Sequence, residues 1–240
     1  ANAAQWSHLQ WETGQGWSQD PMAYYRMENL MEKMASNAAF DSGLVAIIRS
    51  ATADQARENA TALIAAGIEV IEFTTTTPAV FELIEEFTSD STKKHVYVGL
   101  GTAMSRSHVL SGKDAGAKFV ISPHVSQEVI ESTKQAGLIS IPGVASPTEV
   151  ADAIRYGADM LKFFPASSLG TSFLKSIRDP FPGNTWLATG GISVASIADW
   201  VQAGVSGFGI GGPLTSGGVK NIANRVAEFK AAIAAAKESQ

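Results

Sequence analysis

The sequence predicts an α/β fold, a closed (β/α)8 barrel (TIM barrel) preceded by an extra N-terminal helix. Ala-Gly or Tyr-Gly pairs recur just before β-rich runs, at 66–67, 115–116, 136–137, 156–157 and 203–204. Apolar runs of strand length alternate with stretches of helix length, which is typical of a parallel sheet built from βα units. A chain of 240 residues is long enough for eight such units in one domain.

The first 42 residues are predicted to lie outside the barrel, which we expect to occupy residues 43–240. Residues 1–20 contain Trp6, Trp11 and Trp17 among polar residues without periodicity, so we interpret them as an arm. Residues 21–39 place apolar side chains on one helical face and predict a short amphipathic helix. These side chains are Met27, Leu30, Met31 and Met34.

Eight strands are expected, at residues 44–50, 69–76, 95–102, 118–124, 138–144, 160–166, 185–191 and 207–212. The glycine of each Ala-Gly or Tyr-Gly pair suits the left-handed position that ends a helix. An open, doubly wound sheet is the alternative architecture.

Helix starts are expected between these strands. Thr77 before Pro78 predicts an N-cap, and Ser146-Pro147-Thr148-Glu149 predicts an N-cap with a capping box. Ser193 and Ser216 are further N-cap candidates. The last helix should bury one apolar face, formed by Val219, Ile222, Val226, Phe229 and Ile233.

Composition excludes several function classes. A net charge of −5 disfavours nucleic acid or an anionic membrane as a partner. The absence of cysteine excludes disulfides, a thiolate nucleophile and Cys-ligated metals, and it fits a cytoplasmic protein. The four histidines show no metal-binding spacing, so no metal or cofactor is expected. No apolar run is as long as a membrane span.

Lys162 is the most informative residue for function. It lies in the apolar run Met160-Leu161-Lys162-Phe163-Phe164-Pro165. Burial lowers the pKa of a lysine, and only a neutral amine attacks a carbonyl to form a Schiff base. The alternative is a lysine whose stem is buried while its ammonium reaches the surface.

Other candidate residues lie at the C-terminal ends of the strands, where barrels of this kind carry their chemistry. Glu72 follows Val70 and Ile71, a setting that raises the pKa of a carboxyl; alternatively it pairs with a neighbouring cation. Arg49 can bind a carboxylate through two parallel hydrogen bonds, or it is a surface arginine. The remaining strand-end residues are Thr74–Thr76, Gly101, Thr102, Pro123, His124, Thr189, Gly190, Gly191, Gly211 and Gly212.

The two glycine pairs, 190–191 and 211–212, follow the seventh and eighth strands, where barrels often bind phosphate through backbone N–H groups. A tight turn is the other explanation for each pair. His124 is interpreted as a turn residue, and contact with the substrate is the alternative. The whole set suits carbonyl chemistry on a small anionic substrate.

The ordered motifs of this chain resemble those of the class I 2-keto-3-deoxy-6-phosphogluconate (KDPG) and 4-hydroxy-2-oxoglutarate aldolase family over residues 43–235. The motifs are Val45-Ala46-Ile47-Ile48-Arg49, Ile71-Glu72-Phe73-Thr74, Val98-Gly99-Leu100-Gly101-Thr102, Ile121-Ser122-Pro123-His124, Pro142-Gly143-Val144, Leu161-Lys162-Phe163-Phe164-Pro165 and Thr189-Gly190-Gly191-Ile192.

The resemblance implies a homotrimer of TIM barrels that cleaves a 2-keto-3-deoxy-6-phospho sugar acid to pyruvate and glyceraldehyde 3-phosphate. Cleavage of 4-hydroxy-2-oxoglutarate to pyruvate and glyoxylate is a second implied activity. By the same resemblance Lys162 forms the Schiff base and Glu72 is the general acid/base. Arg49 and Thr102 would hold the pyruvyl carboxylate, and the two glycine pairs the phosphate. Substrate contacts are also expected from Pro123, Phe164 and Thr189.

Two positions depart from the family pattern. Some members have an arginine where this chain has Thr76, and some have a phosphate-binding serine where it has Pro213. Two other functions remain open: a non-catalytic barrel that binds a phosphorylated metabolite, and a phosphate-binding isomerase or synthase without a covalent intermediate.

Overall fold

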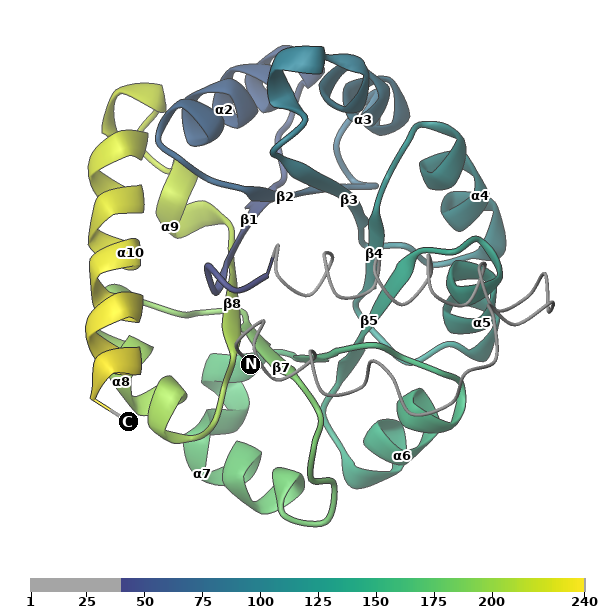
Figure 1. The fold of residues 1–240 in the computed structure, drawn as a ribbon, viewed down its shortest axis with the longest axis vertical. Coiled ribbons are helices and arrows are strands. Elements are labelled where there is room, and N and C mark those ends of the chain that lie inside the picture. Colours follow the sequence, from purple (N-terminus) through teal and green to yellow (C-terminus); the bar gives the residue numbers. More distant parts are fainter. Residues whose placement is uncertain (1–39, 240) are drawn as a thin grey trace, which may run out of the picture. The chain divides into compact units, whose positions relative to one another are not determined.

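The computed structural model describes residues 40–239, which form a closed barrel of eight parallel strands in sequence order, surrounded by helices (Figure 1). The ring closes where β1 pairs with β8 as well as with β2. The predicted (β/α)8 barrel is confirmed, and the alternative prediction of an open, doubly wound sheet is wrong. The strands are β1 Leu44–Ile48, β2 Val70–Thr74, β3 Tyr97–Gly101, β4 Phe119–Ser122, β5 Ile139–Val144, β6 Leu161–Phe163, β7 Trp186–Thr189 and β8 Gly207–Ile210.

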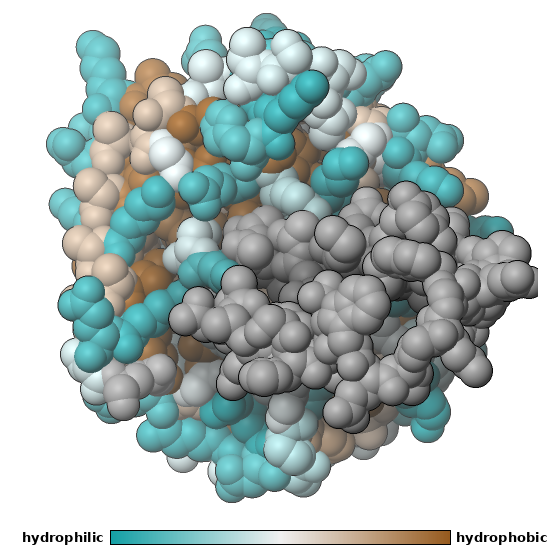
Figure 2. Space-filling view, viewed as in Figure 1, coloured by the Kyte–Doolittle hydropathy of each residue, from teal (hydrophilic) through white to brown (hydrophobic). Residues whose placement is uncertain are grey.

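Helices follow the strands around the outside of the ring. They are α2 Ala53–Ala65, α3 Val80–Ser89, α4 Arg106–Asp114, α5 Gln127–Gln135, α6 Pro147–Arg155, α7 Ala166–Arg178, α8 Ile197–Gln202, α9 Gly212–Thr215 and α10 Ile222–Glu238, with 3-10 turns at Ser91–Lys93, Val194–Ser196 and Val219–Asn221. In the view of Figure 2 hydrophilic side chains cover much of the outer rim. No helix within residues 40–239 is long and apolar enough to cross a membrane. The N-terminal helix expected at residues 21–39 lies outside the described residues, and the domain boundary at residue 42 stays a prediction.

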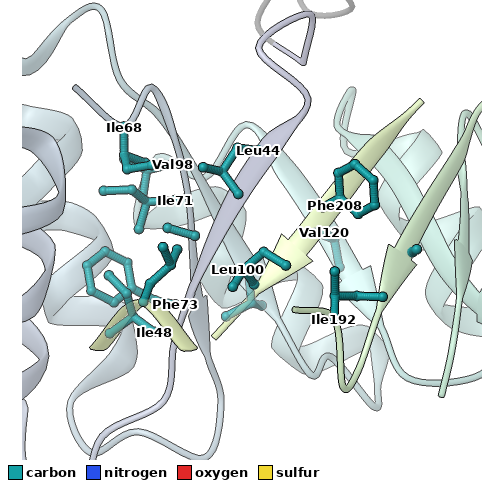
Figure 3. Packing of buried hydrophobic residues seen from close by; sticks show 14 of the residues in the cluster. Leu44, Ile48, Ile68, Ile71, Phe73, Val98, Leu100, Val120, Ile192 and Phe208 are labelled. Atoms are coloured by element: carbon teal, nitrogen blue, oxygen red, sulfur yellow. The ribbon is translucent and has the colours of Figure 1, made fainter. Parts of the chain in front are cut away.

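Strand side chains alternate between the barrel interior and the layer beneath the helices. The outer layer includes Leu44, Ile48, Ile71, Phe73, Val98, Leu100, Val120 and Phe208 (Figure 3). A second apolar cluster fills the interior and contains Val70 of β2 and Met160, the residue before β6. Because the side-chain period is two, Glu72 and Lys162 also point inward, one step nearer the C-terminal ends.

Several predicted helix ends are confirmed. The hydroxyl of Ser146 accepts from the N–H of Glu149 at 3.3 Å and caps α6, while the Glu149 carboxylate accepts from the N–H of Ala145 at 2.8 Å. Ser193 precedes the 3-10 turn before α8. The glycines at 67, 116, 137, 157 and 204 all have positive φ, as expected.

Three other expectations are wrong. Thr77 does not cap a helix, because α3 begins later, at Val80, and the Thr77 hydroxyl instead accepts from the N–H of Ser50 on the neighbouring chain segment. Ser216 ends α9 rather than starting α10. Val219 is 41% exposed because it lies in the 3-10 turn before α10, whose other predicted apolar residues are buried.

Candidate active site

A cavity of about 270 Å³ lies at the C-terminal ends of the strands. Every residue predicted from the sequence as catalytic or substrate-binding lines it: Arg49, Glu72, Thr102, Pro123, Lys162, Phe164, Thr189, Gly190, Gly191, Gly211 and Gly212. These residues come from strands that are far apart in the sequence. The parallel barrel brings them together because it gathers the carboxyl ends of its strands at one end.

Lys162 is buried in the cavity wall, with 7% of its surface exposed. Its neighbours Leu161 and Phe163 belong to the outer apolar layer, and its Nζ lies 4.8 Å from the centre of the Phe164 ring. Burial lowers the pKa of the Lys162 amine, the charge of Glu72 opposes this effect, and the charge of Arg49 adds to it. The side chain therefore does not extend its ammonium to the surface, and it loses its proton more readily than an exposed lysine does.

Glu72 is more deeply buried, with 1% of its surface exposed. Within the part of the chain that the structure describes, its Oε2 has no hydrogen-bond partner. Burial raises the pKa of this carboxyl, while the positive charges of Lys162 and Arg49 oppose the rise. A carboxyl with a raised pKa can hold a proton near neutral pH and release it to a reacting group.

Gly101 makes room for Glu72. A Cβ at position 101 would lie 2.5 Å from the Glu72 Cγ and closer still to its carboxylate. The backbone of β3 therefore forms one side of the carboxylate's pocket. A side chain on this strand would push the carboxylate out of position.

Thr102 has a backbone conformation that is rare for its residue type. Its φ is 57°, in the left-handed region, where a β-branched residue is strained. Such conformations persist only where surrounding contacts enforce them, and they cluster at active sites.

Arg49, at the end of β1, is exposed overall and also lines the cavity.

Glycines form part of the cavity wall where the chain leaves β7 and β8. Gly190 and Gly191 have φ values of 97° and 72°, and Gly211 and Gly212 continue the wall after β8. A Cβ at Gly191 would overlap the side chain of Ser167, so this position also needs glycine because of a close approach. A wall of this kind offers peptide N–H groups to an anion.

The comparisons with known proteins agree with this geometry. The family model of KDPG and KHG aldolases matches residues 36–227. This chain belongs to that family. A probable 2-dehydro-3-deoxy-6-phosphogalactonate aldolase of Rhizobium meliloti (strain 1021) is 35% identical over 177 residues, which cover 73% of this chain and 83% of the relative. The protein is therefore an aldolase, an aldehyde-lyase, and the non-catalytic alternative is wrong.

Solved structures of such aldolases are also similar. The native KDPGal structure has a TM-score of 0.77 and 29% identity, covering 81% of this chain and 96% of that one. The KDPG aldolase from Legionella pneumophila, with pyruvate captured as a covalent carbinolamine intermediate, has a TM-score of 0.69 and 28% identity. That match covers 83% of this chain and 96% of the Legionella protein.

Some strand-end residues of this aldolase do not line the cavity. The hydroxyl of the buried Thr74 donates to the carbonyl of Ile48 at 3.2 Å, and neither Thr75 nor Thr76 reaches the cavity. His124 is also absent from the lining, and its carbonyl accepts from the Ser122 hydroxyl at 2.7 Å. Its Nδ1 is buried without a hydrogen-bond partner among residues 40–239.

The sequence reasoning missed four residues of the lining, all without polar side chains: Ile47, Ile192, Gly209 and Ile210. Alternation could have found Ile47 and Gly209, because each lies two residues along its strand from a position facing the interior. Among the described residues no group of three or more His, Cys, Asp or Glu side chains could hold a metal ion.

Proposed function

We propose that this aldolase cleaves a 2-keto-3-deoxy-6-phospho sugar acid to pyruvate and glyceraldehyde 3-phosphate through a Schiff base on Lys162. The observation that supports this most directly is the pairing of a buried amine with a buried carboxyl in one cavity. Burial shifts their pKa values in opposite directions, toward a neutral amine and a protonated acid. Such opposed shifts mark groups that exchange protons during a reaction.

Lys162 starts the proposed reaction. Its neutral Nζ adds to the C2 carbonyl and forms a carbinolamine, the kind of intermediate captured in the Legionella relative. A proton from Glu72 lets water leave, which gives an iminium ion. Because the iminium nitrogen accepts an electron pair, the C3–C4 bond can now break.

Glu72 carries the protons of the later steps. Its carboxylate takes the proton of the C4 hydroxyl as the C3–C4 bond breaks, so the aldehyde leaves and an enamine remains on Lys162. Glu72 then returns a proton to C3 of the enamine. Addition of water to the resulting iminium releases pyruvate and restores the amine.

The rest of the cavity would hold the two ends of the substrate. Arg49 and Thr102 bind the carboxylate next to C2, with Pro123, Phe164 and Thr189 around the reacting carbons. The glycine pairs at 190–191 and 211–212 bind the phosphate through their N–H groups. Pro213 supplies neither an N–H nor a hydroxyl at the end of this wall, so we expect only a modest preference for phosphate.

The galactonate-derived substrate is the first one to assay, because the Rhizobium relative carries that name. A second activity, cleavage of 4-hydroxy-2-oxoglutarate to pyruvate and glyoxylate, is favoured by the missing donor at Pro213. We further propose a cytoplasmic homotrimer that needs no cofactor, nucleic acid or membrane. Light scattering of the full chain tests the trimer.

Borohydride trapping tests the covalent step. Pyruvate with borohydride should add a reduced pyruvyl group at Lys162, located by peptide mass spectrometry. Lys162→Met keeps an apolar stem and should abolish both the adduct and cleavage. The matched control, Lys175→Met, removes an exposed helix lysine and should change neither. Absence of the adduct from the parent protein would contradict the proposed Schiff base on Lys162.

A further inference from the structure

Four consecutive threonines, residues 74–77, begin at the last residue of β2, the strand that carries Glu72. None of the four lines the cavity. Two of them nevertheless hold the backbone on both sides of the residues proposed to bind the substrate carboxylate, Arg49 and Thr102. We propose that Thr75 and Thr77 are positioning residues for this carboxylate site, an inference that rests on the proposed function.

Thr75 fixes the strained turn at Thr102. Its N–H donates to the carbonyl of Gly101 at 2.9 Å, and its hydroxyl donates to the carbonyl of Thr102 at 2.8 Å. The N–H of Ala103 donates to the carbonyl of Ile121 at 3.1 Å. Both peptide groups that flank Thr102 are therefore bonded, and these bonds oppose the relaxation of its left-handed φ.

Thr77 does the same for Arg49 at the end of β1. The N–H of Ser50 donates to the Thr77 hydroxyl at 3.3 Å, and that hydroxyl lies 3.4 Å from the carbonyl of Ile48. One hydroxyl thus serves as acceptor and donor for the two peptide groups on either side of Arg49. The hydroxyl of Thr74 also donates to the Ile48 carbonyl, at 3.2 Å, and adds a second hydrogen bond to the peptide group that precedes Arg49.

Burial makes the bonds of Thr74 and Thr77 effective, while Thr75 is half-buried. Thr74 and Thr77 are fully buried, so water cannot replace their hydroxyls at the backbone groups they serve. Arg49 itself is exposed overall, and a long side chain on a mobile backbone would lose entropy on binding an anion. Fixing the backbone at Arg49 and Thr102 reduces that loss and sets the direction from which each residue meets the carboxylate.

The test compares two carbonyl compounds in borohydride trapping on the full-length protein. Pyruvate carries the carboxylate, whereas methyl pyruvate presents the same carbonyl without the charge. Thr75→Val replaces the hydroxyl by a methyl group of similar size. It should raise the half-saturating pyruvate concentration by about 2- to 12-fold, the loss expected for one neutral hydrogen bond. The half-saturating concentration of methyl pyruvate should stay unchanged.

Matched variants complete the experiment. Thr75→Ser keeps the hydroxyl and should restore parental pyruvate affinity, and Thr77→Val and Thr77→Ser should differ in the same way. Thr61→Val, on the exposed side of α2, is the control and should change nothing. The thermal unfolding midpoint of each variant shows whether the barrel is intact. If Thr77→Val does not fold, the comparison of Thr75→Val with Thr75→Ser still tests the proposal.

Two results would overturn the inference. One is an unchanged pyruvate affinity in folded Thr75→Val. The other is an equal rise for pyruvate and methyl pyruvate, which would mean that Thr75 supports the cavity in general rather than the carboxylate site. A parent protein that forms no adduct at Lys162 would instead overturn the proposed function, and this inference with it.

Discussion

Replacing Gly101 by alanine tests whether the position of the Glu72 carboxylate limits the reaction. The backbone at Gly101 does not have a positive φ, so alanine itself fits the strand conformation. The added methyl group, however, would lie 2.5 Å from the Glu72 Cγ and nearer still to the carboxylate. Carbon atoms in contact normally lie about 3.5–4.0 Å apart, so the Glu72 side chain must move by about 1 Å or more.

The expected size of the effect follows from that displacement. A misplacement of about 1 Å in a catalytic group can cost on the order of 10²-fold in rate. Overpacking a buried site costs about 1–3 kcal/mol in stability, which a folded barrel of this size can tolerate. Gly101→Ala should therefore fold, with a lower unfolding midpoint, and lose about 10²-fold in kcat.

The assay is cleavage of the phosphorylated substrate, followed by pyruvate release, together with thermal unfolding. The control is Gly207→Ala, also on a buried strand. There the nearest atom to a new Cβ is the Gly43 carbonyl oxygen at 3.4 Å, an ordinary contact distance. We expect the control to keep its parental kcat. A folded Gly101→Ala protein with parental kcat would show that Glu72 can move without loss, and the acid/base role would pass to water or to another group.

Three further predictions concern the charged neighbours of Lys162 and the phosphate end of the cavity. Glu72→Gln should lower kcat by about 10²–10⁴-fold, the usual contribution of a positioned proton carrier. It should also shift the pH profile of pyruvate trapping to lower pH, because the charge of Glu72 raises the pKa of Lys162. A shift to higher pH would contradict this. Arg49→Ala should weaken pyruvate binding roughly 10- to 150-fold, the worth of a charge-assisted bond of about 1.5–3 kcal/mol. The same substitution should also move the pH profile of trapping to higher pH, since Arg49 lowers the pKa of Lys162. If only the affinity for phosphate falls, Arg49 binds the phosphate end of the substrate and not its carboxylate. Pro213→Ser should lower KM for the phosphorylated substrate only. The measurement compares kcat/KM for the phosphorylated and the unphosphorylated substrate in both proteins. If neither value changes, the phosphate does not bind at this end of the cavity.

The fold and the location of the site could be predicted from the sequence because both depend on simple periodicities. A repeated strand–helix unit predicts a parallel sheet, and eight units close it into a barrel. Period-two alternation then places Glu72 and Lys162 on the inner side, two residues after Val70 and Met160. The strand ends meet at one end of the barrel, so residues far apart in the chain could be assigned to one cavity.

Features that depend on the register between strands could not be predicted in this way. Gly101 must be glycine because of a Glu72 side chain on the neighbouring strand, where Glu72 pairs with Gly99 and Thr74 with Gly101. Thr77 resembles a helix N-cap locally, since it precedes Pro78. Its hydroxyl instead bonds to the backbone beside Arg49, on the adjacent segment. Tertiary contacts thus overrode a local capping signal at a position next to the site.

Burial alone makes both reactive groups of this site less charged, and their mutual attraction acts against it. The two groups therefore titrate as a coupled pair, in which losing the charge of one makes the other easier to neutralise. Arg49 removes this symmetry, because its charge lowers the pKa of both Lys162 and Glu72. It thereby adds to the effect of burial on Lys162 and opposes the effect of burial on Glu72. Under the proposed function, a substrate carboxylate at Arg49 would offset part of that charge and so raise the pKa of Glu72 toward the acid form that expels water. The residue proposed to bind the substrate would thus also act on the pKa values of both proposed catalytic groups.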